Sequence, residues 1–367
     1  MTVPPLQTIP ADVVSVADYE RRAMDHMDAA AWAYLQGGAA DEHTVQANLS
    51  AWATCTLQPR VLADVRGGHT RCTLFGETLA HPIILAPVAS QRLFHTDGEL
   101  ATTLAASVMQ GAAVVSTQAS YSLEDIANHN QTAGQGLLWF QLYWQGSRDE
   151  TLALVKRAEV AGYRALVLTV DAPVSGVRNR EQRAGFSLPA TMANLNVAPT
   201  RLPAVPEGKS VVFDSLMTVA PTWEDVAWLV RQTPLPILFK GILHPDDAKK
   251  AVDIGARGIV VSNHGGRVLD GVSASLHALP AVAAVVNGTV PVLVDGGIRR
   301  GTDIIKARAM GATAVMIGRP YIYALSVAGA LGVAHLIRLL REELEIAMAL
   351  TGCKTLDAIQ SELVCTK

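Results

Sequence analysis

The chain has 367 residues, of which 50% are hydrophobic and 17% charged, and its formal net charge at pH 7 is −3. This apolar content is enough for a large buried core, and so little charge argues against a long disordered tail. Because basic residues are not in excess, the composition does not favour a nucleic-acid partner or an anionic membrane surface.

The N-terminal segment lacks the basic and apolar regions of a signal peptide, and no apolar run reaches the roughly 20 residues that a membrane span needs. Four cysteines, Cys55, Cys72, Cys353 and Cys365, show no CxxC spacing. We therefore expect reduced, mostly buried thiols and a cytoplasmic protein, without a metal site or a membrane partner.

Two helices are predicted next, at 16–35 and 42–53.

Eight short runs rich in β-branched residues follow, most of them separated by helical patterns. Their apolar residues are consecutive, which is typical of parallel strands buried on both faces. Eight such units predict a closed (β/α)8 barrel, with an open doubly wound sheet as the alternative. The runs lie at 83–88, 112–116, 137–143, 165–171, 236–240, 258–262, 291–295 and 314–318.

The segments between these runs complete the predicted unit. Helical spacing indicates helices at 149–161, 244–254 and 299–310, several of them followed by a glycine. Residues 187–222 have no clear period and are typical of a lid or loop. A helical tail is predicted at 334–363, and residues 1–367 are expected to form one domain.

Function in such a barrel lies at the carboxyl ends of the strands, so the polar residue that ends each run is informative. Almost every run ends in a chemically capable group, which a purely structural barrel would not need. These residues are Ser116, Gln141 with Tyr143, Thr169 with Asp171, Lys240, Ser262 with His264, Asp295 and Arg319.

The last two runs end in glycine-containing turns, VDGGIRRGTD at 294–303 and MIGRPYIYAL at 316–325. Glycines let backbone N–H groups approach an anion, and the start of the next helix adds the positive end of its dipole. With Arg299 and Arg319 beside them, these turns predict a phosphate site.

The segment SNHGGRVLDG at 262–271 places His264 near Arg267 at the end of the sixth run. Asp171 is a carboxylate of the kind that orients an imidazole, and Arg178 and Arg267 could clamp a carboxylate through forked hydrogen bonds. These residues together favour a catalytic histidine over a structural one. A non-redox isomerase or lyase barrel, or a barrel that only binds a phosphorylated ligand, would keep the phosphate turns but would not need this set.

These motifs, with LFKG at 238–241, WFQLY at 139–143, LTVDAP at 168–173 and VDGGIRRGTDIIKARAMGATAVMIGRP at 294–320, resemble the FMN-dependent 2-hydroxy acid oxidase and dehydrogenase family. That family includes glycolate and lactate oxidases and mandelate dehydrogenase. The resemblance runs from about Val16 to Cys353. It implies oxidation of an (S)-2-hydroxy acid to the 2-oxo acid through FMN.

The resemblance also implies a role for each matching residue. His264 matches the base that takes a proton from the substrate, either from the hydroxyl or from the α-carbon. Asp171 matches the carboxylate that stabilises the resulting imidazolium. Arg178, Arg267, Tyr34 and Tyr143 match the substrate contacts, and Lys240 matches the lysine beside flavin N1. The other expected FMN contacts are Pro87, Val88, Ala89, Ser116, Gln141, Thr169, Ser262 and Asp295, with Gly297, Arg299, Gly318 and Arg319 at the phosphate.

Gln118 and Ser175 stand where plant glycolate oxidases have a tryptophan and a leucine, so we expect a larger or more polar side-chain pocket. Lactate-like and mandelate-like acids both remain open as substrates. Ala89 resembles the oxidases, so O2 is the expected acceptor, with H2O2 as product. A dehydrogenase using a quinone or another non-oxygen acceptor is the alternative. Family members commonly form tetramers, and a homotetramer is expected here too.

Overall fold

The computed structural model describes residues 3–192, 194–198, 202–205 and 207–365. Its centre is a closed barrel of eight strands, all paired in parallel, in the order β4, β5, β6, β7, β8, β9, β10 and β11, with β11 pairing back to β4. The eight strands confirm the eight predicted runs, and the closure rules out the open sheet. They span Ile83–Leu85, Ala112–Val115, Leu137–Leu142, Leu166–Thr169, Ile237–Ile242, Gly258–Val261, Val292–Val294 and Ala314–Ile317.

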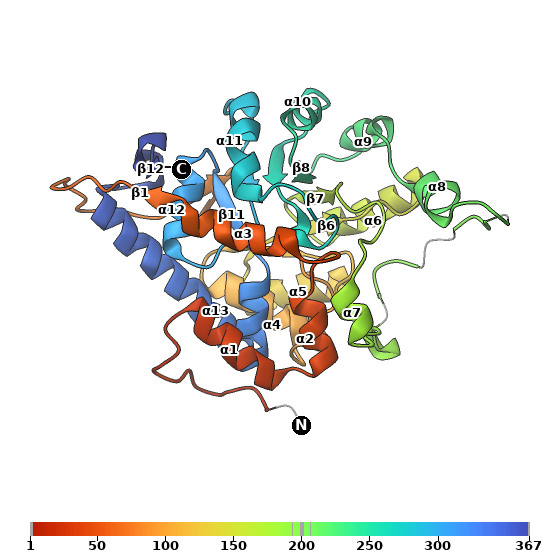
Figure 1. The fold of residues 1–367 in the computed structure, drawn as a ribbon, viewed down its shortest axis with the longest axis horizontal. Coiled ribbons are helices and arrows are strands. Elements are labelled where there is room, and N and C mark those ends of the chain that lie inside the picture. The colour runs from red at the N-terminus through yellow and green to blue at the C-terminus, as the bar shows by residue number, and fades with distance from the viewer. Residues whose placement is uncertain (1–2, 193, 199–201, 206, 366–367) are drawn as a thin grey trace.

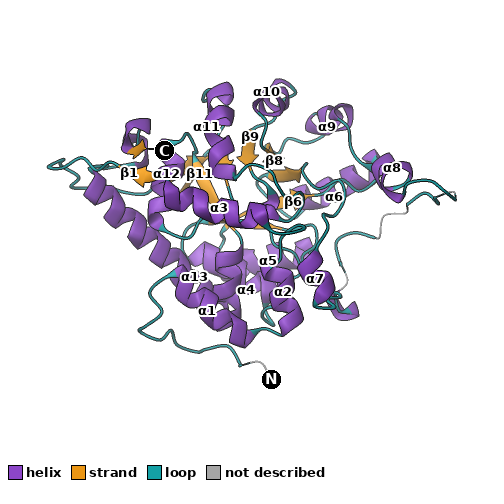
Figure 2. Cartoon of the chain, in the orientation of Figure 1, coloured by secondary structure: helices purple, strands orange, loops and turns teal. Residues whose placement is uncertain are grey.

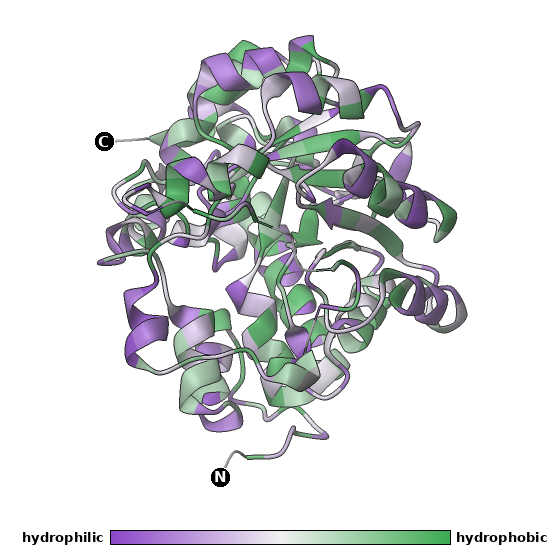
Figure 3. Ribbon diagram, turned by 90° about the vertical axis from the view of Figure 1, so that its right-hand side faces the viewer, coloured by the Kyte–Doolittle hydropathy of each residue, from purple (hydrophilic) through white to green (hydrophobic). Residues whose placement is uncertain are grey.

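Helices surround this barrel, as the purple ribbons around the orange strands show in Figure 2. The strands are mostly green in the hydropathy colouring of Figure 3, whereas the helices mix green and purple, which fits strands buried on both faces and helices buried on one. The helices are α4 (Gly98–Val108), α5 (Leu123–Ala133), α6 (Arg148–Val160), α9 (Trp223–Val230), α10 (Pro245–Asp253), α11 (Ser275–Val286), α12 (Gly301–Ala309) and α13 (Arg319–Thr351).

The helices predicted at 149–161, 244–254 and 299–310 are confirmed as α6, α10 and α12, with small shifts at their ends. The start of each is set by a side-chain cap. Ser147 accepts the N–H of Glu150, and His244 accepts that of Asp246. In the first turn of α12, the Asp303 carboxylate reaches back and accepts the backbone N–H groups of Arg299 and Arg300, which fixes the chain just before the helix.

The first predicted helix is wrong as one element, because the structure divides it into α1 (Val16–His26) and α2 (Ala29–Gln36). Met27 has an extended backbone, and the Asp28 side chain accepts the N–H of Ala31 at 2.7 Å. A new N-cap therefore starts a second helix within a continuous apolar pattern. The helix predicted at 42–53 is confirmed as α3 (His43–Thr54).

The predicted C-terminal tail is also partly wrong. Helix α13 begins earlier, directly after β11, and runs beside α1 and α4 (Figure 1) with a kink at Ala328 and Gly329. It ends at Gly352, whose φ is +77°, and 3-10 turns at Leu356–Ala358 and Ser361–Leu363 follow. The last strand, β12 (Val364–Cys365), pairs with β1 (Thr56–Leu57).

The sequence was expected to hold no apolar run long enough to cross a membrane. By length and composition alone, however, helix α13 is long and apolar enough to do so. However, 67% of its most apolar window is buried inside the protein. It packs against α1, α4 and α12, so its apolar surface is explained by the core.

The described residues between 187 and 222 form mostly irregular chain, as expected, with 3-10 turns at Ala190–Met192 and Leu216–Val219 and the short helix α8 (Val211–Asp214). The short helix α7 (Asn179–Arg183) precedes them. Residues 193, 199–201 and 206 of the predicted loop lie outside the described residues. A hairpin of β2 (Cys72–Leu74) and β3 (Glu77–Leu79) was not predicted, although its turn contains Gly76 at φ +83°.

Candidate active site

A cavity of about 360 Å³ lies at the carboxyl ends of the barrel strands. It brings together nearly all the side chains that the sequence singles out, from every strand of the barrel. Asp171 and Ser262 do not line it and lie behind the residues that do. The predicted residues lining it are Tyr34, Pro87, Val88, Ala89, Ser116, Gln141, Tyr143, Thr169, Arg178, Lys240, His264, Arg267, Asp295, Gly297, Arg299, Gly318 and Arg319.

His264 is held in a defined orientation by Asp171. Its Nδ1 lies 3.0 Å from Oδ1 of Asp171, and since a carboxylate only accepts, Nδ1 carries the proton. Burial would raise the pKa of Asp171, but the hydrogen bond and charge of His264 lower it overall. The other ring nitrogen, Nε2, therefore remains to accept a proton, and it faces the Tyr143 hydroxyl at 3.5 Å.

Backbone geometry fixes both partners of this pair. His264 has a φ of +57°, in the left-handed region that non-glycine residues rarely adopt, and its N–H donates to Oγ of Ser262 at 3.0 Å. Gly241, with a φ of +110°, passes so close to Asp171 that an added Cβ would lie 2.4 Å from the Cβ of Asp171. A glycine at this position allows the carboxylate to approach the imidazole.

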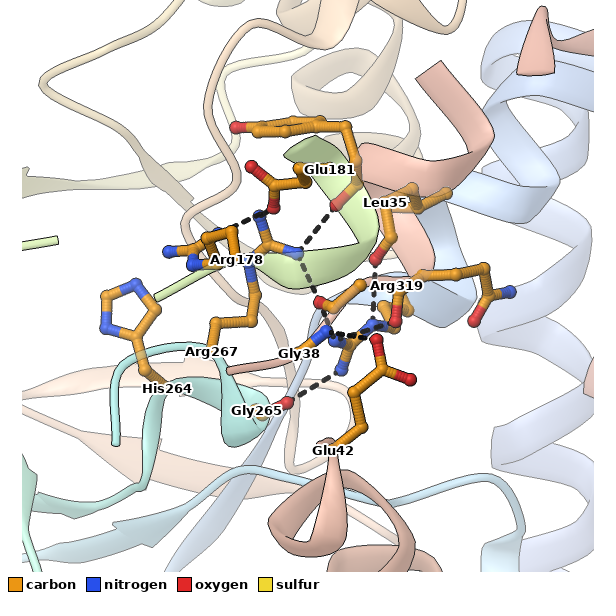
Figure 4. Close-up of polar contacts among 12 residues, drawn as sticks. Leu35, Gly38, Glu42, Arg178, Glu181, His264, Gly265, Arg267 and Arg319 are labelled. Carbon is orange, nitrogen blue, oxygen red and sulfur yellow. Dashed lines mark hydrogen bonds and ion pairs between the residues drawn. The ribbon is translucent and has the colours of Figure 1, made fainter. Parts of the chain in front are cut away.

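Two arginines face the cavity beside His264 (Figure 4). Nη1 of Arg178 and Nη2 of Arg267 both donate to Oε1 of Glu181, at 2.8 and 2.9 Å. Arg267 also donates to the backbone carbonyls of Tyr34 and Gly37, and its guanidinium lies 5.0 Å from the centre of the Tyr34 ring. A fixed, paired arrangement of guanidinium groups suits a planar carboxylate.

Lys240 is a buried cation, with 5% of its side chain exposed. Its Nζ lies 3.0 Å from Oδ2 of Asp295 and donates to Oγ of Ser262 at 2.9 Å. Burial alone would lower the pKa of Lys240, but the charges of Asp295 and Asp171 raise it overall. The ammonium is therefore charged at neutral pH, inside the cavity.

Gln141 organises the polar wall formed by β5, β6 and β7. Its Oε1 accepts the Ser116 hydroxyl at 3.2 Å and the N–H of Thr117 at 3.1 Å, while Nε2 donates to the Thr169 hydroxyl at 3.1 Å. The amide is thus fixed in one orientation, as a recognition element for the edge of a ring requires.

The glycine turns after the last two strands form one end of the cavity. Gly297 has a φ of +86°, and a Cβ there would lie 2.2 Å from the carbonyl oxygen of Asn48, so only glycine fits. Arg299 and the start of α13 lie at the same end. Backbone N–H groups, a helix start and arginines together suit a phosphate.

Arg319, expected at the phosphate, lines this end of the cavity, but its guanidinium is also hydrogen-bonded to backbone carbonyls of the protein. Its guanidinium donates to the carbonyls of Leu35, Gly37 and Gly265, each at 2.9 Å (Figure 4). Burial, with the nearby charge of Arg267, lowers the pKa of Arg319 to about 10. The group is still cationic at neutral pH, and it ties α2 to the cavity wall.

The residues present fit FMN on two observations. Oδ1 of Asp295 is buried without a hydrogen-bond partner among the described residues, although Asp295 lines the cavity, and it could accept a ribityl hydroxyl. Five cationic side chains line the cavity, at Arg178, Lys240, Arg267, Arg299 and Arg319, against two carboxylates, at Glu181 and Asp295. A phosphate dianion and a substrate carboxylate would balance that excess.

Sequence reasoning missed Glu181, the carboxylate between the two arginines. It lies three residues after Arg178, so the two face one another on a single helical turn, and this i,i+3 spacing was the available signal. Its contact with Arg267 joins distant segments of the chain and could not be read from spacing.

One family model and several known proteins are similar to this chain over nearly its whole length. Residues 23–366 match the model of the family described as FMN-dependent dehydrogenase. The chain is 49% identical to an L-lactate oxidase of Alicycliphilus denitrificans, over 97% of each chain, and 46% identical to a 4-hydroxymandelate oxidase of Amycolatopsis orientalis, over 94% of this chain and 96% of the relative. A solved structure of a mandelate oxidase variant with (S)-mandelic acid superposes with a TM-score of 0.87 at 42% identity, covering 96% of this chain and 98% of the other.

Proposed function

The chain belongs to the FMN-dependent dehydrogenase family, and from that premise we propose that it oxidises an (S)-2-hydroxy acid to the 2-oxo acid and passes the electrons to O2, giving H2O2. The observation that carries this proposal is that His264, held by Asp171 from behind, lines the same cavity as Arg178 and Arg267. The oxidases among its relatives support O2 as the acceptor.

The cofactor is FMN, which when bound supplies a two-electron acceptor for the substrate and a donor to O2. We assign its phosphate to Gly297, Gly318, Arg299 and Arg319, whose N–H groups and charges suit an anion. The remaining cofactor contacts that we propose are Pro87, Val88, Ala89, Ser116, Gln141, Thr169, Lys240, Ser262 and Asp295. Ser262 does not line the cavity, so its proposed part is to hold Lys240 and the backbone of His264 in place.

The substrate carboxylate would be bound by Arg178 and Arg267, with Tyr34 beside them, so that one face of the α-carbon is presented. His264 would then take the proton at Nε2, and Asp171 would stabilise the resulting imidazolium through Nδ1. The Tyr143 hydroxyl, 3.5 Å from Nε2, would bind the substrate hydroxyl or carboxylate near that nitrogen. Burial raises the pKa of Tyr143, so it serves as a neutral hydrogen-bond donor.

Lys240 would hold a fixed positive charge at one edge of the flavin ring. Asp295 and Ser262 keep its ammonium in place, so no reorganisation is needed when negative charge develops nearby. Because Lys240 is buried and paired with Asp295, it is not an ordinary solvent-exposed surface lysine.

The substrate side chain has room to be large. A second cavity of about 900 Å³ shares Gln118, Ser175, Tyr143 and His264 with the first, and its wall includes Trp144, Trp223 and Phe239. The methyl group of lactate or the phenyl group of mandelate on the α-carbon would point into this second cavity. Glycolate has no such group. Lactate-like and mandelate-like acids are therefore the substrate class that we propose.

An oxygen-electrode assay with (S)-lactate, (S)-mandelate and glycolate tests the proposal. We expect O2 uptake matched by equal H2O2 and 2-oxo acid, and a kcat/KM for glycolate at least about tenfold below the better of the other two, because a missing apolar group costs roughly 1–3 kcal/mol. Uptake with none of the three, in protein loaded with FMN, would contradict the function. Glycolate as the best substrate would contradict the assignment of the side-chain cavity.

We propose further that the chain works as one domain, residues 1–367, in the cytoplasm and as a homotetramer. All four cysteines are free and three are buried, which suits a reducing compartment. Val160, Ile346 and Leu350 are large apolar side chains exposed on α6 and α13, and such outer helical surfaces are available for contact with further copies. Light scattering would give the mass of the assembly.

A further inference from the structure

Glu181 contacts both arginines that we assign to the substrate carboxylate, although the proposed reaction does not use it. A single oxygen, Oε1, accepts from Nη1 of Arg178 at 2.8 Å and from Nη2 of Arg267 at 2.9 Å. The side chain is 14% exposed and lines the cavity. Figure 4 shows it beside Arg178 and Arg267. Glu181, on α7, thus bridges Arg178, which directly precedes that helix, and Arg267, in the turn after β9.

The Glu181 carboxylate offsets the repulsion between the two guanidinium groups. Burial and the charge of Arg178 both lower the pKa of Arg267, and the carboxylate of Glu181 opposes them. Two buried guanidinium groups repel one another, so without an anion between them they would move apart or turn away. One carboxylate leaves the group of three with a net charge of +1, which a substrate carboxylate would neutralise.

The bridge also leaves donors for a ligand. Glu181 engages one nitrogen of each guanidinium, and Nε of Arg178 is buried with no partner among the described residues. On Arg267, Nη1 is fully used by the carbonyls of Tyr34 and Gly37, which fixes the plane of the group. Glu181 therefore aligns the pair without occupying all of its hydrogen-bonding capacity.

We propose that Glu181 is a positioning residue that holds the guanidinium groups of Arg178 and Arg267 side by side, and thereby sets the affinity of the cavity for small 2-hydroxy and 2-oxo monocarboxylates. This inference rests on the proposed function for the identity of the ligand. The alternative role for the same carboxylate, an internal anion that competes with substrate, predicts the opposite effect on affinity.

Calorimetric titration of the FMN-loaded protein with pyruvate, an unreactive 2-oxo acid, separates the two roles. Glu181→Gln keeps the shape and removes the charge, and we expect its Kd for pyruvate to rise about tenfold, in the range for a lost charge-assisted contact. Glu181→Asp keeps the charge and should lose less affinity than Glu181→Gln. The matched control is Glu124→Gln, which removes a carboxylate paired with Arg157 away from the cavity and should leave the Kd unchanged.

Steady-state kinetics supply a second readout. Because the substrate carboxylate is bound alike before and during the reaction, Glu181→Gln should raise KM about tenfold and leave kcat within about threefold. Equal or tighter pyruvate binding in Glu181→Gln, equal losses in the two Glu181 variants, or a wild-type protein that does not bind pyruvate would each overturn the inference. If the wild-type protein binds pyruvate but oxidises no 2-hydroxy acid, the proposed function fails and the titration still decides the role of Glu181.

Discussion

The variant His264→Ala is expected to retain FMN but to reduce it with substrate more than about a thousandfold more slowly, at the upper part of the range for a positioned acid or base. In the structure Nδ1 is committed to Asp171, and only Nε2 faces the cavity, so no other atom of this side chain can take its place. The measurement is the rate of flavin bleaching after anaerobic mixing with (S)-lactate or (S)-mandelate in a stopped-flow instrument.

His277→Ala is the matched control for this variant, because His277 lies exposed on α11 and its side chain makes no hydrogen bond among the described residues. Its bleaching rate should equal that of the wild-type protein. A His264→Ala protein that bleaches at a near-normal rate would mean that another group takes the proton, and the assignment of the base would be wrong.

Arg267→Leu should have the second largest effect. We expect kcat/KM to fall by about a thousandfold, because truncating one partner of a buried, hydrogen-bonded charge pair costs roughly 2–5 kcal/mol, and the substrate carboxylate loses that partner. The carbonyls of Tyr34 and Gly37 lose theirs too, so the thermal midpoint should fall. Initial rates over a range of substrate concentrations, with the FMN content checked, measure the effect.

Arg178→Leu separates substrate binding from stability. The hydrogen bonds of the Arg178 side chain, among the described residues, go only to Glu181, so its loss should raise KM with a smaller change in thermal midpoint. If neither arginine variant changed the dependence of rate on substrate concentration, the carboxylate would have to be bound elsewhere.

The barrel itself was predictable because a parallel strand covered on both faces must be apolar at consecutive positions. Ile83–Leu85, Leu166–Thr169 and Ala314–Ile317 are fully buried along their length, and the polar residues that end the runs then fall at one mouth of the barrel. The location of the candidate site followed from this geometry, and the residue roles followed from the resemblance.

The break at Met27 and Asp28 is a local feature that the apolar pattern concealed: the pattern continues across it, while one side-chain cap at Asp28 starts a new helix.

Features that depend on tertiary contacts were not predictable. The carbonyl contacts of Arg319 and the bridge from Glu181 to Arg267 join segments far apart in the chain. Spacing along a sequence carries no information about such pairs.

The central claim, that FMN in this cavity takes electrons from a 2-hydroxy acid and gives them to oxygen, is tested most directly by one spectroscopic measurement. The purified yellow protein is mixed without oxygen with (S)-mandelate or (S)-lactate, and air is then admitted. We predict that the flavin absorbance bleaches within the turnover time and returns on contact with air as the 2-oxo acid accumulates. Protein that stays colourless after incubation with FMN, or flavin that remains oxidised with both acids, would contradict the account.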